Sequence, residues 1–330
     1  MPSMGKSMKH ISSIVIAGLA FLSCSGLALA APDWPTKPIT LVVPFSAGGG
    51  NDSVARLLAP ALGEELGQSV VIDNRAGAGG TVGAGVVAQA APDGYTLLIC
   101  STGNLAVATA VYPKLGYRIQ DFAPIAHIAN TPTIWVAAPQ VPAGSLKEFI
   151  SLAKREPGKH NYASSGNGTT PHLAGAAMAT RNGLEMQHIP YKGSAAAYPD
   201  LAGGRVSVMM DAIISALPLV EAGRVKGLAV GTAQRLPQIP SVPTLAEQGL
   251  ADMGYTGWVG LCAPRGTPAP VVEKISRGVK AALGRRNMRD FLVRQMAEPV
   301  GDGPGKFSQT IGRDAATWRD IAKSSGITLD

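Results

Sequence analysis

Three loops in this sequence have the small and hydroxyl-bearing residues that can hold a small anion. The first, Phe45 to Asp52, follows the apolar run from Ile39 to Val43 and is rich in glycine. The second, Ser101 to Asn104, follows the apolar run YTLLIC, and the third runs from Ser164 to Thr170. Each loop leads from a predicted strand toward a predicted helix, whose free N–H groups attract negative charge. The candidate ligand-binding residues in these loops are Phe45, Ser46, Ala47, Gly48, Ser101, Thr102, Ser164, Ser165, Gly166, Asn167, Gly168 and Thr169.

Tight packing of a strand against a helix explains the glycines of any single loop equally well, but three such loops together favour binding. Three further side chains join the candidates. His172 lies in the first turn of a predicted helix, where it either serves a ligand or caps the helix. Asp211 ends the strand-like run VSVMMD, where it either accepts a hydrogen bond from a ligand or orders a loop. Tyr191, beside Lys192, is a candidate pocket wall, although exposure on a loop is the alternative.

No motif for catalysis, metal or cofactor binding is complete. The segment AGAGGTVG does not fit G-x-G-x-x-G, and GDGPGKFS has Phe307 where a P-loop needs Ser or Thr. The sequence has no G-x-S-x-G, C-x-x-C or H-E-x-x-H motif. We therefore expect no catalytic residue, no metal and no cofactor. A hydrolase with His172 as base and Ser164 or Ser165 as nucleophile is disfavoured, because no third residue orients the pair.

Strand-like and helix-like segments alternate through most of the chain, which predicts an α/β fold with largely parallel sheets. About three hundred residues exceed what one hydrophobic core usually holds, so we expect two lobes. We place residues 31–131 and 256–330 in a discontinuous first lobe and residues 132–255 in the second. The last third has one strand-like run, TGWVGLCAP, and two long helical patterns, 268–283 and 307–324. These predict a tail that packs back on the first lobe.

The first thirty residues have the layout of a secretory signal peptide. Basic residues precede an apolar stretch from 11 to 29, and Ala28-Leu29-Ala30 forms a small-residue cleavage site. We expect the mature protein to begin near Ala31. An uncleaved membrane anchor is disfavoured by the Ser, Gly and Cys content of the stretch. Lipidation at Cys24 is disfavoured because Phe21 replaces the branched aliphatic residue such a site requires.

The chain is mildly basic, with 29 Lys and Arg residues against 22 Asp and Glu residues. These basic residues are scattered, and aromatic residues make up only 5% of the chain. Nucleic acid is therefore not an expected partner, whereas anionic ligands suit this balance. Two cysteines remain after signal-peptide removal, Cys100 and Cys262, both at the ends of strand-like runs. Buried free thiols are favoured over a disulfide, since sequence alone gives no Cα separation.

Several long blocks of the sequence resemble, in order, those of one protein family. They are WPTKPITLVVPFSAGGGNDSVAR, VVIDNRAGAGGTVGAGVVAQAAPDGYTLL, HIPYKGSAAAYPDLAGGRV, VPTLAEQG and APRGTP. The family is that of the periplasmic solute-binding proteins of tripartite tricarboxylate transporters, often called Bug proteins. The resemblance covers nearly the whole mature chain.

The resemblance implies a two-lobed periplasmic binding protein, a Venus flytrap, whose ligand cleft lies between two doubly wound sheets. It implies a periplasmic monomer that is not an enzyme, captures a small organic carboxylate and delivers it to the permease subunits of a tripartite transporter. The family's ligand contacts fall on Phe45, Ala47 and Gly48 and on Ser165 to Thr169, and Asp211 matches a position that discriminates the rest of the ligand. A ligand-sensing partner of a membrane sensor kinase would use the same binding chemistry, so this alternative stays open.

Overall fold

The computed structural model describes Met1 and residues 34–324. The predicted signal peptide, apart from Met1, and Cys24 lie outside the described residues. By its contacts the chain divides into a short unit, Met1–Trp34, and a compact unit, Pro35–Asp330, which contains every helix and strand described below. Among the described residues, none of the helices has the length and apolar character needed to cross a membrane.

The strands form one continuous curled array in the order β2-β1-β3-β9-β4-β7-β5-β6, and β8 and β10 also pair with β4. Their bounds are β1 Ile39–Val43, β2 Val70–Asn74, β3 Thr96–Ser101, β4 Phe122–Ala137, β5 Asn161–Ser164, β6 Gln187–Pro190, β7 Val208–Ala212, β8 Lys226–Val230, β9 Thr256–Pro264 and β10 Glu298–Asp302. Strands β1, β2 and β3 are parallel, as are β5, β6 and β7. Parallel strands joined by helices direct their carboxyl ends toward one edge, where ligands bind in such folds.

The sixteen-residue strand β4 connects the two groups of parallel strands. It pairs with β9 as far as Pro132 and with β7 from Thr133 onward, so its middle lies between the groups. Sequence patterns predict only its second half, from Thr133. Pro124 interrupts the apolar alternation of the first half and coincides with a register shift against β9.

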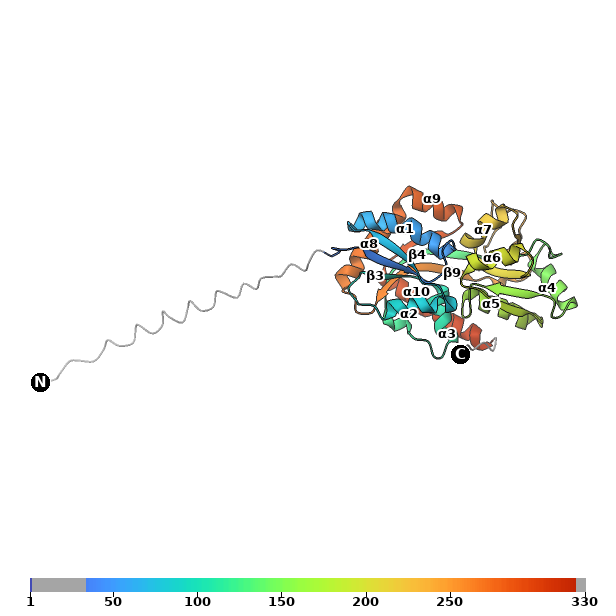
Figure 1. Cartoon of the computed structure of the whole chain (residues 1–330), viewed down its shortest axis with the longest axis horizontal. Helices are drawn as coiled ribbons and strands as arrows, with labels where there is room; N and C mark the ends of the chain where they lie inside the picture. Colours follow the sequence, from blue (N-terminus) through green and yellow to red (C-terminus); the bar gives the residue numbers. More distant parts are fainter. Residues whose placement is uncertain (2–33, 325–330) are drawn as a thin grey trace. The chain divides into compact units, whose positions relative to one another are not determined.

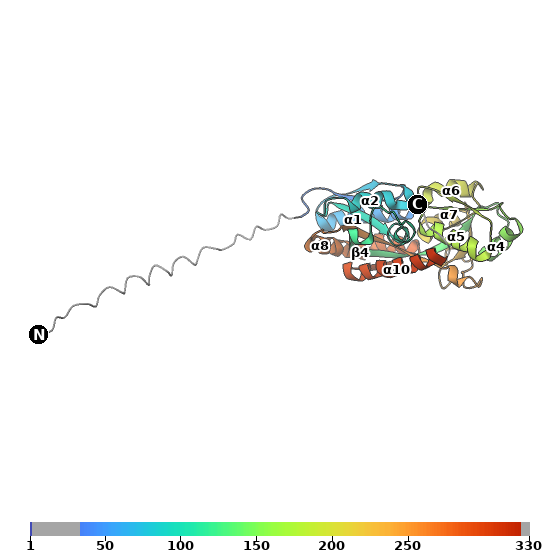
Figure 2. The same ribbon diagram turned by 90° about the horizontal axis from the view of Figure 1, so that it is seen from below.

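The helices gather around these two groups of strands (Figures 1 and 2). Around β1, β3 and β9 lie α1 Gly50–Leu66, α2 Thr81–Ala88, α3 Ala108–Val111, α8 Ala269–Gly284, α9 Arg286–Arg294 and α10 Pro304–Ser324. Around β5, β6 and β7 lie α4 Leu146–Arg155, α5 Thr170–Asn182, α6 Ser194–Ala202 and α7 Ile213–Glu221. The short helical turns are η1 Ala78–Gly80, η2 Thr102–Val107, η3 Ile119–Asp121 and η4 Ala251–Met253. The predicted α/β class is confirmed, and α9 and β10 are elements that the sequence patterns did not predict.

Two hydrophobic cores fill the space between strands and helices. One contains Trp135 and Phe149, both fully buried, with the strands and helices of the second group. The other contains Trp258 and Phe307 with β3, η2 and α10. Phe307 stacks on His127 at a ring-centroid distance of 5.3 Å and meets Trp258 edge-on at 5.1 Å. The C-terminal helix α10 is thereby fixed on the first group of strands, as the sequence predicts for the tail.

Cys100 and Cys262 are fully buried on the neighbouring strands β3 and β9. Their sulfur atoms lie 2.6 Å apart, and both cysteines are free. Burial raises the pKa of the Cys100 thiol well above its ordinary value, which keeps it protonated.

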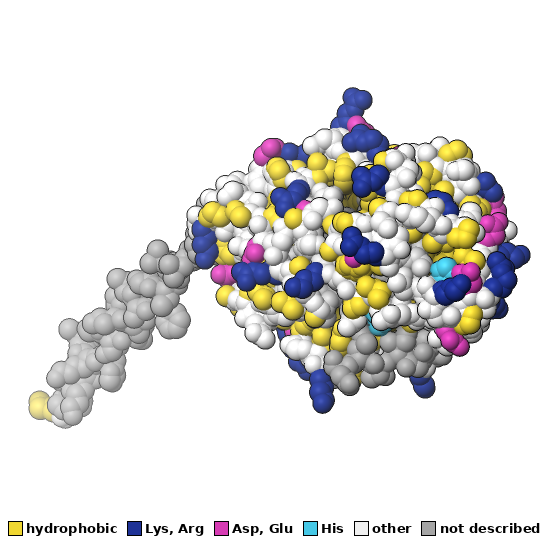
Figure 3. Space-filling model, turned by 45° about the vertical axis from the view of Figure 1, so that its right-hand side comes forward, with side chains coloured by type: hydrophobic (Ala, Val, Ile, Leu, Met, Phe, Trp, Pro, Cys, Tyr) yellow, Lys and Arg dark blue, Asp and Glu magenta, His cyan; other side chains and the backbone are white. Residues whose placement is uncertain are grey.

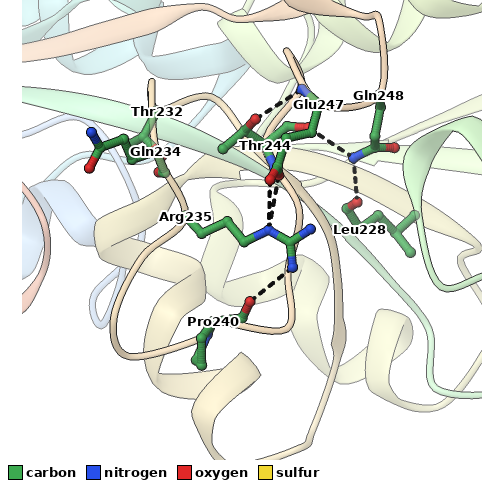
Figure 4. Close-up of polar contacts among 8 residues, drawn as sticks. All are labelled: Leu228, Thr232, Gln234, Arg235, Pro240, Thr244, Glu247 and Gln248. Carbon is green, nitrogen blue, oxygen red and sulfur yellow. Dashed lines mark hydrogen bonds and ion pairs between the residues drawn. The ribbon is translucent and has the colours of Figure 1, made fainter.

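The connection from β8 to β9 has no long helix and is stabilised by polar contacts (Figure 4). The Arg235 Nε donates to both carboxylate oxygens of Glu247, at 3.0 Å each. The same carboxylate accepts from the Thr244 N–H at 2.7 Å, while the Glu247 N–H donates to the Thr244 hydroxyl. This reciprocal arrangement is a capping box. The backbone hydrogen bond and Arg235 together lower the pKa of Glu247 below its usual range.

Truncating Phe307 to alanine tests the role of α10. We expect Phe307→Ala to lower the free energy of unfolding by about 3 to 5 kcal/mol, because it leaves a cavity against His127 and Trp258. Urea denaturation of both proteins measures the difference. The matched control is Val293→Ala on α9, whose side chain is 60% exposed and whose loss should change stability by about 0.5 kcal/mol or less. Equal effects of the two substitutions would contradict this account of the core.

Candidate functional site

A pocket of about 740 Å³ lies where the carboxyl ends of β1, β3, β5 and β7 meet. Its wall comes from residues of both groups of strands and from β4 and β9 between them. The lining residues are Phe45, Ser46, Gly49, Gly50, Asn51, Ser101, Thr102, Gly103, Thr131, Thr133, Ser165, Thr169, Thr170, Pro171, Ser194, Met210, Asp211, Ala212, Ile214, Ser215, Gly257, Trp258 and Val259.

The first loop, residues 45–49, is held in shape by the buried carboxylate of Asp52. This carboxylate accepts from the Gly48 N–H at 2.8 Å, from Asn74 at 2.9 Å and from Arg56 at 2.7 Å. Burial alone would raise the pKa of Asp52, but these hydrogen bonds outweigh it and lower the pKa. Gly48 has φ +85°, a left-handed conformation that side chains rarely adopt. These contacts within the protein fix the conformation of the first loop.

The third loop, residues 164–169, contains its own hydrogen-bond network. The Ser164 hydroxyl accepts from the Gly166 N–H at 3.1 Å, and the Thr169 hydroxyl donates to the Gly166 carbonyl at 2.7 Å. The Gly168 N–H donates to Nδ1 of His172 at 3.2 Å. Gly166 and Gly168 both have positive φ. These contacts turn Ser165 and Thr169 toward the pocket while Ser164 stays fully buried behind them.

Three helices begin at the pocket wall, and each presents N–H groups that have no partner inside its own helix. Helix α1 begins after Gly49, α5 after Thr169 and α7 after Ala212, and all three of these cap residues line the pocket. The π-helical turn η2 adds Ser101 and Thr102. Each helix start carries about half a positive charge. Together the three helices therefore place about one and a half positive charges around the pocket.

Asp211 carries the only ionisable side chain among the described residues that line this pocket. Its carboxylate accepts hydrogen bonds from the Ser194 hydroxyl (2.9 Å), the Tyr198 hydroxyl (2.8 Å) and the Ala212 N–H (2.8 Å). Burial raises its pKa to about 6, against the opposing effect of these three donors. The helix starts and the hydroxyls around the pocket supply donors that can hold an anion beside this single carboxylate. On the face drawn in Figure 3, Lys and Arg side chains are scattered rather than gathered.

The structure places the predicted site residues in two layers. Those that line the pocket are Phe45, Ser46, Ser101, Thr102, Ser165, Thr169 and Asp211. Those that lie outside its lining are Ala47, Gly48, Ser164, Gly166, Asn167, Gly168, His172 and Tyr191. Several of these outer residues hold the loops in shape and do not face the pocket. The Gly48 N–H donates to the Asp52 carboxylate, and His172 accepts from the Gly168 N–H. The Tyr191 hydroxyl donates to Asp200 at 2.7 Å.

Sequence patterns missed the lining residues that come from β4 and α7. Thr131 and Thr133 lie at the middle of β4, and Ile214 and Ser215 lie in the first turn of α7. None of them sits in a glycine-rich turn. The one feature that could have indicated these α7 residues is the predicted end of a strand at Asp211, since a helix begins directly after it.

A stack of three rings lies behind the third loop. His188 on β6 stacks on His172 of α5, with ring centroids 4.0 Å apart, and on Tyr162 of β5 at 5.0 Å. A hydrogen bond of 2.6 Å joins Nε2 of His188 to the Ser164 hydroxyl. Burial lowers the pKa of His172 to about 4, and burial together with the neighbouring His172 lowers that of His188 to about 3. Both imidazoles are therefore neutral at neutral pH.

Among the described residues, no cluster of three or more His, Cys, Asp or Glu side chains could hold a metal ion. The polar groups around the pocket are main-chain N–H groups and hydroxyls, which can donate, and one carboxylate, which accepts. Such a set can bind and orient an anion.

A family model described as the tripartite tricarboxylate transporter family receptor matches residues 54–327. The chain belongs to this family. Protein BugT of Bordetella pertussis is 33% identical over 94% of this chain and 96% of its own. The resemblance to Bug proteins is thereby confirmed, and the chain is a solute-binding protein of that family.

Two solved structures of similar proteins have ligands in their descriptions. Rpa4515 of R. palustris, described with adipate, is 40% identical, with a TM-score of 0.85 over 89% of this chain and 99% of its own. MatC of Rhodopseudomonas palustris, described with bound malate, is 35% identical, with a TM-score of 0.84 over 87% of this chain and 99% of its own. The predicted α/β fold of a periplasmic binding protein is confirmed.

The stacked pair of His172, which is buried, and His188, which is half-buried, should make the protein sensitive to acid. Because folding lowers both pKa values, the unfolded chain binds more protons between about pH 6.5 and the folded values, so stability falls as pH falls through this range. Asp211 opposes this below about pH 6, since folding raises its pKa. We expect His188→Phe to lose less stability than the unsubstituted protein between pH 7 and pH 5. Urea midpoints at both pH values measure this, and an equal loss in the two proteins would refute the assignment.

Proposed function

We propose that this protein binds a small organic carboxylate in the pocket at the starts of α1, α5 and α7 and delivers it to a membrane permease. One observation carries the proposal: three helix N-termini surround a pocket whose described lining contains one acidic and no basic side chain. A carboxylate accepts several N–H bonds at once, and such charge-assisted hydrogen bonds are among the stronger ones. Neutral donors also let the ligand leave, as delivery requires.

The relatives support this ligand class. The structures of Rpa4515 with adipate and of MatC with malate contain dicarboxylates of four to six carbons. We infer that the acid lies with one carboxylate near Thr170 of α5 and near the first turn of α1 beyond Gly50, whose own N–H donates to Ser215. The rest of the molecule would then extend toward Asp211 and Trp258. The three donors on Asp211 hold its carboxylate in place, where it can accept a hydrogen bond from the rest of the ligand.

The proposed mechanism is capture, closure and delivery. We propose lobes of residues 31–131 with 256–330 and of residues 132–255, which meet at the pocket. The Ser46 hydroxyl donates to the Lys192 carbonyl at 2.8 Å, and the Gly50 N–H donates to the Ser215 hydroxyl at 3.1 Å, in each case between these lobes. A ligand that contacts both lobes favours the closed state by its higher affinity for it. We further propose export through the N-terminal signal peptide and action in the periplasm as a monomer.

Transport explains the site better than hydrolysis. Ser164 and His188 form a hydrogen bond that resembles a nucleophile and its base. Ser164 is fully buried, however, and does not line the pocket. His188 is contacted by aromatic rings instead of an orienting carboxylate. We therefore propose binding without catalysis, as in the solute-binding relatives.

A thermal-shift panel of mono-, di- and tricarboxylates, amino acids, sugars and amines tests the ligand class. We expect stabilisation only by carboxylates, because the pocket donates N–H groups to an anion. A ligand at a hundred times its Kd adds about 2.7 kcal/mol of stability. The protein should first be unfolded and refolded to remove any ligand retained from expression. Stabilisation by sugars or amines, with none by any acid, would contradict the proposal.

Replacing Thr170 tests the main-chain donors directly. Thr170→Pro removes one N–H at the first residue of α5, directly before the native Pro171. Proline is tolerated in the first helical turn, and Thr169 before it already has the extended conformation that proline requires (φ −96°, ψ 162°). We expect the Kd for the best acid of the panel to rise about tenfold to a hundredfold, the loss of one hydrogen bond to a charge.

The control is Thr170→Val, which keeps the N–H and loses only the hydroxyl. Calorimetric titration should place its Kd within about threefold of the unsubstituted protein. Thr170→Pro that binds as tightly as Thr170→Val would show that this N–H does not hold the ligand.

A further inference from the structure

We propose that His188 is a positioning residue for the ligand-binding loop 164–170, although it does not line the pocket. Through its hydrogen bond to Ser164 and its stacking on His172, it fixes the conformation in which Ser165, Thr169 and Thr170 face the ligand. The inference rests on the proposed function, since that function makes this loop a ligand contact.

The two histidines hold the loop at two separate points. His188 binds the Ser164 hydroxyl at 2.6 Å, at the carboxyl end of β5 where the loop begins. His172 accepts from the Gly168 N–H at 3.2 Å, two residues before α5 begins. The rings of the two histidines are nearly parallel, 17° apart, with centroids separated by 4.0 Å. A shift of one ring therefore displaces the other, and with it the far end of the loop.

The loop depends on these contacts because its own backbone conformation is unfavourable for most residues. Gly166 and Gly168 have φ values of +132° and +69°. A glycine backbone can adopt many conformations. A loop that contains two glycines therefore needs contacts from other side chains to keep a single conformation. Ser164 transmits the restriction: its hydroxyl, bound to His188, accepts from the Gly166 N–H at 3.1 Å.

Strand pairing fixes His188 itself. His188 of β6 is the register partner of Tyr162 on the parallel strand β5, and their rings stack at 5.0 Å. The Tyr162 ring lies against Gly175 of α5, where a side chain would collide with it. Helix α5 thus approaches β5 closely enough for His172 to reach His188. Burial keeps both imidazoles neutral, which allows them to stack without mutual repulsion.

Two substitutions separate positioning from stability. His188→Phe keeps an aromatic ring on Tyr162 and His172 but loses the bond to Ser164. The matched control is His160→Phe at the opposite end of β5. His160 also lies near a serine hydroxyl, Ser207 at 3.3 Å, and an aromatic ring, Phe149 at 5.5 Å, but it does not contact the loop.

The experiment is residue-resolved amide hydrogen exchange on the ligand-free full chain, followed by calorimetric titration with adipate and malate. We expect His188→Phe to speed exchange of the Gly166 and Gly168 amides about tenfold and to raise the Kd of whichever probe binds by about fivefold to tenfold, the loss of one hydrogen bond. His160→Phe should leave both readouts unchanged, even where it lowers the melting temperature.

Unchanged exchange at Gly166 and Gly168 in His188→Phe would overturn the positioning role. An equal acceleration by His160→Phe would also overturn it, because a general loss of stability would then explain both. If the unsubstituted protein binds neither acid nor any other carboxylate, the proposed function fails, and the exchange measurement still decides the role of His188.

Discussion

The site depends on one constraint: the first N–H groups of a helix have no carbonyl partner within that helix, so they must find one elsewhere. Here α1, α5 and α7 all begin at the same pocket. Their starts converge because the two groups of parallel strands run in opposite directions along β4, so that the carboxyl end of β1 faces those of β5 and β7. The buried polar pocket is stable because a bound anion, or water in its place, can complete these hydrogen bonds.

The loops before the helices need their own support, and each obtains it from residues behind the pocket. Asp52 accepts from the Gly48 N–H, Asn74 donates to the Phe45 carbonyl, and Asn104 accepts from the Ser101 N–H at 2.8 Å. His172 and Ser164 do the same for the third loop. Each binding loop thus consists of glycine and hydroxyl residues in front and a more specific polar residue behind. The residues proposed to contact the ligand are therefore different from those that hold each loop in its conformation.

The sequence predicts three loops with the local order of strand, glycine-rich turn and helix start, and residues of all three line the pocket, while their role in binding stays a prediction. It does not predict that His188 supports the third loop, since a lone histidine in a short strand carries no such signal. Thr131 and Thr133 escaped detection for a similar reason: β4 crosses between the two groups of strands, and the proline-containing half of that strand does not alternate. The places of His188, Thr131 and Thr133 depend on contacts between elements that are far apart in the sequence. The same holds for Cys100 and Cys262, which are neighbours in the structure.

The central claim is that main-chain N–H groups at helix starts hold a ligand carboxylate. A crystal structure of the protein with adipate or malate bound tests it most directly. The account predicts carboxylate oxygens within about 3.2 Å of main-chain nitrogens in the first turns of α1 and α5, with no Lys or Arg side chain in contact. A carboxylate paired with a Lys or Arg side chain, or bound outside the pocket, would contradict it.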